Sequence, residues 1–465
     1  MNDSSFEQFD ALIIGAGQAG KPLVLALAKK GWRTAIVERS YVGGTCINYG
    51  CTPTKTLIAS AQMASDARRA VDYGIETGDV QVVFKAIIDR KNRIVEQFRE
   101  GIEKQFADTE NLTFIGGEAR FVGTKQLAVS LNDGGERKLT AEHIFIDCGT
   151  HPTKPDLPGL DTVPWFTSTT LMDVPELPKH LLILGGGYIG VEFSQLFRRF
   201  GSEVTIIERG NQLLSREDED IAEALTKVLA GEGVQVLTNT SVDKVSKDAD
   251  GGVRLSLETV DGPIQLTGSH LLVVTGTTPN TATLNLDATG VTTNEHGFIE
   301  VNDQLETSQP GIYGLGDIKG GPAFTHISYD DYRVINQNLL EGGNATIKGR
   351  SVPYTIFTDP QLGRIGLSEQ EARQEGRSIK IATIPMTSVA RAIETERTQG
   401  LMKVLIDAEN DQIIGAAILG VEGGEIMSML QIAMMGNLPY TRLRDAIFAH
   451  PTLAESLNNL FSKVS

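Results

Sequence analysis

Short apolar runs alternate with helix-length amphipathic segments, and the alternation is clearest near the N-terminus. The apolar run over 9–14 predicts a strand, and the segment 21–30 has the spacing of a helix. A second apolar run, over 34–37, ends at Glu38. Two strands joined by a helix within about 30 residues predict a βαβ unit with parallel strands.

The same pattern returns in the middle of the chain. A strand is predicted over 180–184, a helix over 191–200, and a second strand over 203–207 that ends at Glu208. Two such units in one chain predict an α/β fold that contains two dinucleotide-binding domains.

Between and beyond these units the pattern changes. Apolar residues at helical spacing predict an amphipathic helix with one buried face, formed by Ile87, Ile94, Phe98, Ile102 and Phe106. From about Ser351 the glycine-rich motifs stop. Strands are predicted over 404–407 and 413–419, and a helix over 424–435. We therefore expect a separate C-terminal domain.

Composition and charge narrow the class of protein. The chain has 465 residues, enough for about three domains of roughly 150 residues each. It carries 42 basic and 59 acidic side chains, a net charge of −17, which argues against nucleic acid and anionic membranes as partners. No apolar run reaches the ~18 residues of a membrane span, and no secretory signal is visible. With only three cysteines, we expect a cytoplasmic protein without a disulfide scaffold.

Glycine-rich turns follow the first strand of each unit. Gly15, Gly17 and Gly20 form the first motif, and Gly185, Gly187 and Gly190 the second. Such glycines allow a tight turn and let the backbone approach a pyrophosphate at the helix N-terminus. Glu38 and Glu208 can accept hydrogen bonds from ribose hydroxyls. The alternative is that both turns are purely structural. Because each motif lies between a predicted strand and helix and is followed by a glutamate, the sequence favours two nucleotide sites with electron transfer between them.

Two cysteines lie five positions apart in a glycine-rich segment, 43–55. At the start of a helix, Cys46 and Cys51 would reach each other across about one turn, and the helix N-terminus would lower a thiol pKa. Such a pair can cycle between dithiol and disulfide. The alternatives are two buried structural cysteines or metal ligation, for which two thiols are too few to form a structural zinc site. Cys148 follows a strand without a partner in sequence and is expected to be structural.

Taken in order, these motifs resemble the class I pyridine nucleotide–disulfide oxidoreductases, the family of dihydrolipoamide dehydrogenase, glutathione reductase and mercuric reductase. The resemblance covers essentially the whole chain, including segments 307–317 and 357–372 and the sequence His450-Pro451-Thr452 with Glu455. It implies two Rossmann-like domains, for FAD and NAD(P)H, and a C-terminal α+β dimerisation domain. The implied boundaries are 1–150 and 276–345 for FAD, 151–275 for NAD(P)H, and 346–465 for dimerisation.

The resemblance also implies roles for the catalytic residues. Cys51 resembles the charge-transfer thiol beside the flavin, and Cys46 the interchange thiol that meets the substrate. Lys55 resembles the lysine near flavin N5, with Glu192 as its ion-pair partner. His450 and Glu455 resemble the acid–base pair, which the other subunit of a homodimer would supply.

Cofactor contacts are implied for both nucleotides. Asp317, in the second FAD motif, would hold the sugar chain of the flavin. The full set of implied contacts is Gly15, Gly17, Gly20, Glu38, Gly44, Thr45, Gly149, Gly316 and Asp317 for FAD, and Gly185, Gly187, Gly190, Glu208 and Gly276 for the nicotinamide nucleotide. Because Glu208 would repel a 2′-phosphate, NADH is favoured over NADPH, although Arg209 follows it.

Within the family, segments 324–333 and 450–461 most resemble the bacterial reactive-chlorine-resistance flavoproteins, a mercuric-reductase-like group. That likeness implies electron flow from NAD(P)H through FAD and the dithiol to a metal ion such as Cu(II), in oxidant or metal resistance. The vicinal C-terminal cysteines of mercuric reductases are missing. The segment 448–451 keeps only the second histidine of the His-x-His-Pro sequence typical of lipoamide dehydrogenases.

The sequence leaves three other functions open. One is a dihydrolipoamide dehydrogenase or another disulfide reductase, and a second is a low-turnover flavin and dithiol redox sensor. A third is a dehydrogenase without flavin. No resident metal site is predicted. Four methionines share the predicted helix 424–435, and we expect them to fill a buried dimer interface rather than to bind Cu(I): Met427, Met429, Met434 and Met435.

Overall fold

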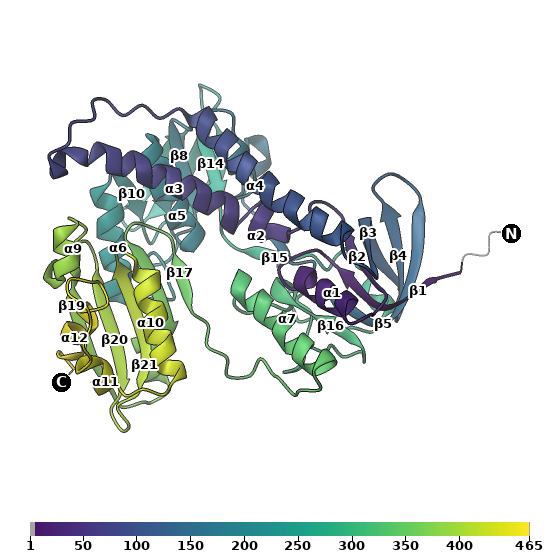
Figure 1. Ribbon diagram of the computed structural model, residues 1–465. Coiled ribbons are helices and arrows are strands. Elements are labelled where there is room, and N and C mark those ends of the chain that lie inside the picture. Colours follow the sequence, from purple (N-terminus) through teal and green to yellow (C-terminus); the bar gives the residue numbers. More distant parts are fainter. Residues whose placement is uncertain (1–4, 465) are drawn as a thin grey trace. The chain divides into compact units, whose positions relative to one another are not determined.

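The computed structural model describes residues 5–464, which form two compact units (Figure 1). The first unit contains the described residues up to Thr56 together with Ile88–Thr153 and Gly276–Arg350. The second contains Leu57–Ile87, Lys154–Thr275 and the described residues from Ser351 onward. No helix in residues 5–464 is both long enough and apolar enough to cross a membrane.

The first unit is built on one sheet whose parallel core runs β3-β2-β1-β5-β16. The outer parts of β3 and β5 continue past this core and pair antiparallel with β4, so the ladder closes on itself. A separate two-stranded ladder joins β6 and β15. The strands are β1 (Glu7–Ile14), β2 (Thr34–Glu38), β3 (Leu112–Gly123), β4 (Gln126–Leu131), β5 (Glu136–Ile146), β6 (Thr150–Pro152), β15 (Thr277–Pro279) and β16 (Ile312–Gly314).

Helices α1 and α7 pack against each other in the first unit, and both contribute to the core on their side of the sheet (Figure 1). Leu12 and Ile13 of β1 are fully buried, one on each face, as expected for a parallel strand covered on both sides. The helices of this unit, including two that continue into the second, are α1 (Gly20–Lys29), α2 (Gly44–Asn48), α3 (Cys51–Arg68), α4 (Phe84–Ala107) and α7 (Thr325–Leu340).

The second unit contains a parallel sheet in the order β10-β9-β8-β14-β7 and a three-stranded antiparallel sheet, β11-β12-β13. Its predicted strands over 180–184 and 203–207 are found as predicted. The elements are β7 (Trp165–Phe166), β8 (His180–Leu184), α5 (Tyr188–Phe200), β9 (Glu203–Ile207), α6 (Glu219–Gly231), β10 (Val234–Leu237), β11 (Ser241–Lys247), β12 (Val253–Thr259), β13 (Gly262–Gly268) and β14 (His270–Val273).

The C-terminal part of the second unit is an antiparallel sheet in the order β17-β18-β21-β20-β19, with α10 packed on β18 and β21 (Figure 1). Its elements are β17 (Tyr354–Ile356), β18 (Gln361–Gly366), α8 (Glu369–Gln374), β19 (Ile379–Pro385), α9 (Ala390–Glu394), β20 (Leu401–Asp407), β21 (Ile413–Gly420), α10 (Gly423–Met435), α11 (Tyr440–Arg444) and α12 (Ser456–Phe461).

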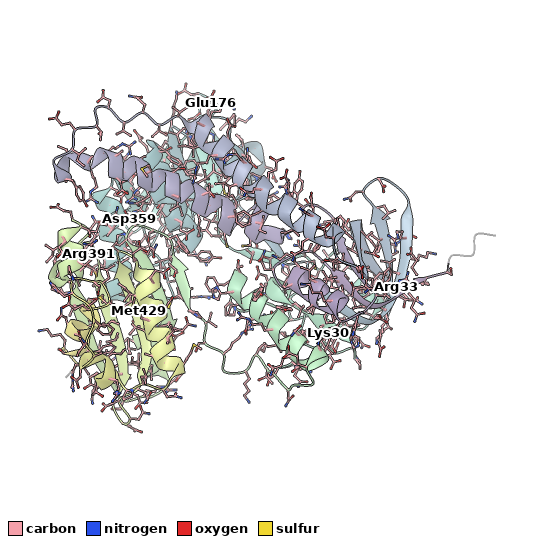
Figure 2. The ribbon with its side chains drawn as sticks, viewed as in Figure 1. Lys30, Arg33, Glu176, Asp359, Arg391 and Met429 are labelled. Carbon is pink, nitrogen blue, oxygen red and sulfur yellow. The ribbon has the colours of Figure 1, made fainter. Side chains whose placement is uncertain are left out.

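Two buried cations, each paired with partly exposed carboxylates, join the two halves of this unit. Arg199 Nη2 lies 2.7 Å from Glu232 Oε1 and 2.9 Å from Asp359 Oδ2, which Figure 2 labels. Lys403 Nζ lies 2.8 Å from Glu369 Oε2 and 3.0 Å from Asp220 Oδ2. A buried charge is stable only when it is paired, so these contacts hold α5 and α6 against the C-terminal sheet.

The predicted amphipathic helix exists as α4, but its buried face differs from the prediction. Ile102 and Phe106 are buried as expected, whereas Phe98 is 53% exposed. Val95 and the side chain of Lys91 take buried positions instead. The prediction used only the spacing of apolar residues and therefore missed Lys91, since the long stem of a lysine can be buried along an apolar surface.

Candidate active site and cofactor sites

The first glycine motif forms a turn that ties β1 to β2. Gly15 adopts φ +101°, a conformation that favours glycine, and its N–H donates to the Val37 carbonyl (2.8 Å). Ala16 N donates to Glu38 Oε2 (2.9 Å), and Ser40 N donates to Glu38 Oε1 (2.9 Å). The backbone therefore holds the Glu38 carboxylate in place, and each oxygen keeps acceptor capacity for a ribose hydroxyl.

The second glycine motif repeats this geometry. Gly185 adopts φ +117°, and its N–H donates to the Ile207 carbonyl (2.9 Å). Gly186 N donates to Glu208 Oε2 (2.6 Å), and Gly210 N donates to Glu208 Oε1 (2.6 Å). Gly190 lets the start of α5 pack closely against the preceding turn, because a β-carbon at this position would lie 2.1 Å from the Gly185 carbonyl oxygen.

The predicted flavin site brings residues from distant segments onto the first motif. A side chain at Gly44 would place its β-carbon 2.8 Å from the Gly17 Cα, so these two segments touch through their backbones. Thr45 follows Gly44 in the short helix α2. This close backbone packing beside the N-terminus of α1 fits a bound pyrophosphate, and the residues present therefore fit FAD.

The second predicted flavin motif, which contains Gly316 and Asp317, is held by a carboxylate that the sequence analysis did not predict. Gly316 N donates to Asp331 Oδ2 (2.8 Å), and the fully buried Asp331 forms ion pairs with Lys319 and Arg350. The neighbouring Asp317 is deeply placed, and burial raises its pKa although Lys319 opposes the shift. Asp331 lies in the segment 324–333 that the family resemblance singled out, but an isolated aspartate on a helix gave no signal of its role.

The two cysteines lie on separate helices rather than on one. Cys46 is in α2, Cys51 begins α3, and Tyr49 and Gly50 interrupt the helical backbone between them. The two thiols are nonetheless close enough to interact, and this interaction, together with burial, raises the pKa of the Cys46 thiol. The expectation of a lowered pKa is therefore wrong for Cys46, because its neighbour's sulfur and its burial both favour the protonated form.

Two polar neighbours of the cysteines were not predicted. Thr325 Oγ1, at the start of α7, lies 3.2 Å from Cys51 Sγ. Lys21 is close enough to Cys46 for its positive charge to oppose the rise in the thiol pKa. Lys21 follows Gly20 directly, but no sequence spacing relates either residue to the cysteine segment.

Asn48 braces the segment between the cysteines. Its Nδ2 donates to the carbonyls of Val42 (2.9 Å) and Gly44 (3.0 Å), and its Oδ1 accepts from Arg99 Nε (3.1 Å) and Nη2 (3.0 Å). Arg99 in turn stacks over the Tyr41 ring, 3.6 Å from the ring centroid. Asn48 is buried, and its bond to Val42 is shielded from water, whereas those to Gly44 and Arg99 are partly buried.

Lys55 and Glu192 belong to different units. Lys55 lies in the second turn of α3, and Glu192 is buried in α5, where its Oε1 accepts a hydrogen bond from Phe357 N (2.8 Å). Their pairing stays a prediction.

His450 and Glu455 are adjacent, as the resemblance implied. His450 Nδ1 lies 2.8 Å from Glu455 Oε2, and Glu455 N donates to Thr452 Oγ1 (3.2 Å). A proton on Nδ1 donated to the carboxylate leaves Nε2 as a hydrogen-bond acceptor and base. The His450 side chain is 66% exposed, which leaves the ring accessible.

Cys148 has a different environment from Cys46 and Cys51. Its thiol donates to the Asn280 carbonyl (3.5 Å), and burial raises its pKa to about 12. A protonated, partly buried thiol has low reactivity. The next residue, Gly149, has φ +62°, and Gly276, which takes the same place after β14 of the second unit, has φ +146°. Both positions therefore favour glycine.

Metal-ligand geometry is not evident in residues 5–464, where no group of three or more His, Cys, Asp or Glu side chains could hold a metal ion. The methionines of α10 divide between two environments. Met427 and Met434 pack in the core of the C-terminal sheet, whereas Met429, labelled in Figure 2, and Met435 are exposed. The expectation that all four fill a dimer interface is therefore wrong for Met427, which is buried within its own subunit, and stays a prediction for the other three.

Comparison with known proteins decides the family. The family model described as pyridine nucleotide-disulphide oxidoreductase matches residues 9–331, and the dimerisation domain of the same family matches 352–461. The chain belongs to the pyridine nucleotide-disulphide oxidoreductase family. It is an oxidoreductase of a family that uses FAD and NAD(P)H, and the predicted α/β fold with two dinucleotide-binding domains is confirmed.

Individual relatives narrow the type. The chain is 40% identical over 461 residues to the probable pyridine nucleotide-disulfide oxidoreductase RclA of Escherichia coli (strain K12), covering 98% of this chain and 99% of the relative. It is 35% identical over 458 residues to a mercuric reductase of Shewanella putrefaciens, covering 98% and 81%. A structure described as a Cu(II) complex of HOCl-induced flavoprotein disulfide reductase RclA from Escherichia coli has a TM-score of 0.91, with 39% identity over 99% of this chain and 100% of that chain. The protein is a flavoprotein disulfide reductase of the RclA and mercuric reductase type.

Proposed function

We propose that this protein reduces metal ions, with Cu(II) as the acceptor, by passing electrons from NADH through FAD and the Cys46–Cys51 pair. The likeness to RclA supports this acceptor, because the similar structure is described as a Cu(II) complex. The proposed setting is the cytoplasm under oxidant or metal stress. NADH is the proposed donor because the Glu208 carboxylate would repel a 2′-phosphate.

The proposed reaction balances. FAD, when bound, accepts a hydride from NADH and supplies two electrons to the disulfide. Conversion of the dithiol to the disulfide releases two electrons and two protons, and two Cu(II) ions take up one electron each to become Cu(I). Overall, NADH and two Cu(II) give NAD⁺, two Cu(I) and one proton.

The side chains of this chain would control the thiol protons. The interaction with Cys51 and burial both favour a protonated Cys46. Removal of the Cys46 proton then requires a base. We propose a homodimer in which His450 of one subunit, oriented by Glu455, serves the cysteine pair of the other.

A disulfide acceptor such as lipoamide is the second candidate, and the His450–Glu455 pair favours it. Reduction of a disulfide releases a thiolate that must be protonated, and an oriented imidazole supplies that proton. Metal reduction has no leaving thiolate. A redox sensor would have the same dithiol but little steady-state turnover.

The test is NADH consumption by FAD-loaded protein without oxygen, with Cu(II) and with lipoamide in separate reactions. We expect turnover with Cu(II), loss of it in Cys46→Ser, and retention in Cys148→Ser, the matched control for a thiol outside the pair. Turnover with lipoamide alone would make the protein a disulfide reductase. Negligible turnover with both acceptors would favour the sensor.

A further inference from the structure

Asp147 is a buried carboxyl at the point where the two predicted flavin motifs meet. It follows β5 directly, and its Oδ2 accepts a hydrogen bond from Gly20 N at 2.7 Å. A β-carbon at Gly17 would lie 2.7 Å from Asp147 Oδ2, and one at Gly316 would lie 2.8 Å from Asp147 Oδ1. The carboxyl thus touches glycines of both motifs and occupies the N-terminus of α1, where the pyrophosphate of FAD would bind.

The duplicated half of the chain provides an internal comparison. Asp147 N donates to the Ile14 carbonyl (2.8 Å), and Val274 N donates to the corresponding Leu184 carbonyl (3.0 Å). A β-carbon at Gly15 would meet the Asp147 carbonyl oxygen, and one at Gly185 would meet the Val274 carbonyl oxygen. Val274 is therefore the structural equivalent of Asp147. The nicotinamide half forms the same turn with an apolar side chain, so the turn itself does not require a carboxyl.

The charges around Asp147 are negative. Burial is the largest cause of the strong rise in the pKa of Asp147, and the carboxylates of Asp317, Asp331 and Glu38 add to it from the turn after β16, from α7 and from β2. The hydrogen bond from Gly20 N opposes this rise but does not outweigh it. The nearby cations, Lys319 and Arg350, are both engaged by Asp331. In the part of the chain that the structure describes, no basic side chain forms an ion pair with Asp147.

A pyrophosphate would add two further negative charges at the same helix N-terminus. An ionised carboxylate buried there without a cation would be repelled by the ligand as well as by three neighbouring carboxylates, and a buried group in that position takes up a proton instead. We propose that Asp147 is a neutral carboxylic acid in the FAD complex and that its ionisation opposes FAD binding. Its acidic proton is then available as a hydrogen-bond donor on the flavin side of the turn.

The sign of the pH dependence follows from linkage. If FAD binds the neutral form, the affinity is highest below the pKa of Asp147 in the apoprotein and falls by up to tenfold per pH unit above it. Asp147→Asn is neutral at every pH, has the same shape and can still donate from its amide. It should bind FAD at least as tightly as the wild type, with a flatter pH profile.

Infrared difference spectroscopy of the FAD-loaded protein tests the protonation state directly. The wild type minus Asp147→Asn spectrum should contain the C=O stretching band of a neutral carboxylic acid, and this band should shift in D₂O. A difference spectrum that contains only carboxylate bands would overturn the proposal. Asp133→Asn, in an exposed loop, is the control and should leave no acid band.

FAD affinity of the apoprotein, measured by quenching of flavin fluorescence from pH 6 to 9, gives a second reading. Binding by Asp147→Asn that is more than tenfold weaker than wild type, in a protein with unchanged far-UV circular dichroism, would show that the charge is required and would also refute the proposal. If the asparagine variant does not fold, Asp147→Val serves as reference in both experiments, because the chain already uses valine at the equivalent position 274.

Discussion

Glu38 and Glu208 make the same pair of hydrogen bonds in the two halves of a duplicated fold. Each carboxylate accepts one bond from the second residue of its glycine motif and one from the backbone two residues beyond itself. The repetition explains why a glutamate stands at the end of β2 and directly after β9: in each half the carboxylate closes the turn before any nucleotide binds. The group that we propose selects NADH over NADPH therefore also holds the loop.

Replacing Glu208 with glutamine should raise the KM for NADH by about tenfold while leaving the KM for NADPH less affected. A charge-assisted hydrogen bond is worth about 1.5–3 kcal/mol, and the amide retains only part of it. Initial rates with each nucleotide check this. Glu203→Gln, exposed at the start of the preceding strand β9, is the control. An equal loss for both nucleotides would mean that Glu208 acts only on the loop.

The His450–Glu455 pair should matter more for a disulfide than for Cu(II). His450→Gln removes the base, and general acid–base catalysis contributes about 10²–10⁴-fold. We expect a loss of that size with lipoamide, if it is turned over, and a smaller loss with Cu(II). Glu455→Gln should reproduce part of the effect, since it weakens the orientation of the ring. Equal losses with both acceptors would place proton removal from Cys46 on both paths.

Asn48→Ala should loosen the cysteine segment and lower stability. The substitution leaves the buried Val42 carbonyl without its donor, at a cost of about 1–3 kcal/mol, and also removes the partly buried bonds to Gly44 and Arg99. Thermal unfolding should occur at a lower temperature, and alkylation of Cys46 should be faster. Asn92→Ala, exposed on α4, should change neither. Unchanged alkylation would show that α2 is held by other contacts.

Acid should weaken the contact between α8 and β20. The hydrogen bond with Lys403 lowers the pKa of Glu369 from its ordinary value of 4.5. A carboxyl whose pKa is lower in the folded state stabilises the fold above the unfolded value, and this contribution is lost as the pH falls through the folded value. The melting temperature of the wild type should therefore fall more steeply below pH 4.5 than that of Glu369→Gln. The control is Glu375→Gln, which changes an exposed carboxylate at the end of the same helix. Parallel curves for the wild type and Glu369→Gln would contradict the prediction.

Local sequence determined the elements whose signals are themselves local. The two βαβ units, the glycine turns and the strand-terminal glutamates follow from spacing within about 30 residues, because periodicity and turn chemistry act over that range. The likeness of short motifs was enough to identify the family, the cofactors and the fold class. The contact between His450 and Glu455 could also be predicted, because the two residues lie only five positions apart.

Tertiary structure alone decided which distant groups meet. Asp147 contacts Gly20 across 127 positions of sequence, and Thr325 contacts Cys51 across 274. No periodicity relates residues so far apart; the strand order of the sheet and the packing of α7 bring them together. The same is true of the raised pKa of Cys46, which depends on burial and on a neighbouring thiol held on a different helix. Burial and long-range contact set the chemistry of a side chain, and both exist only once the chain is folded.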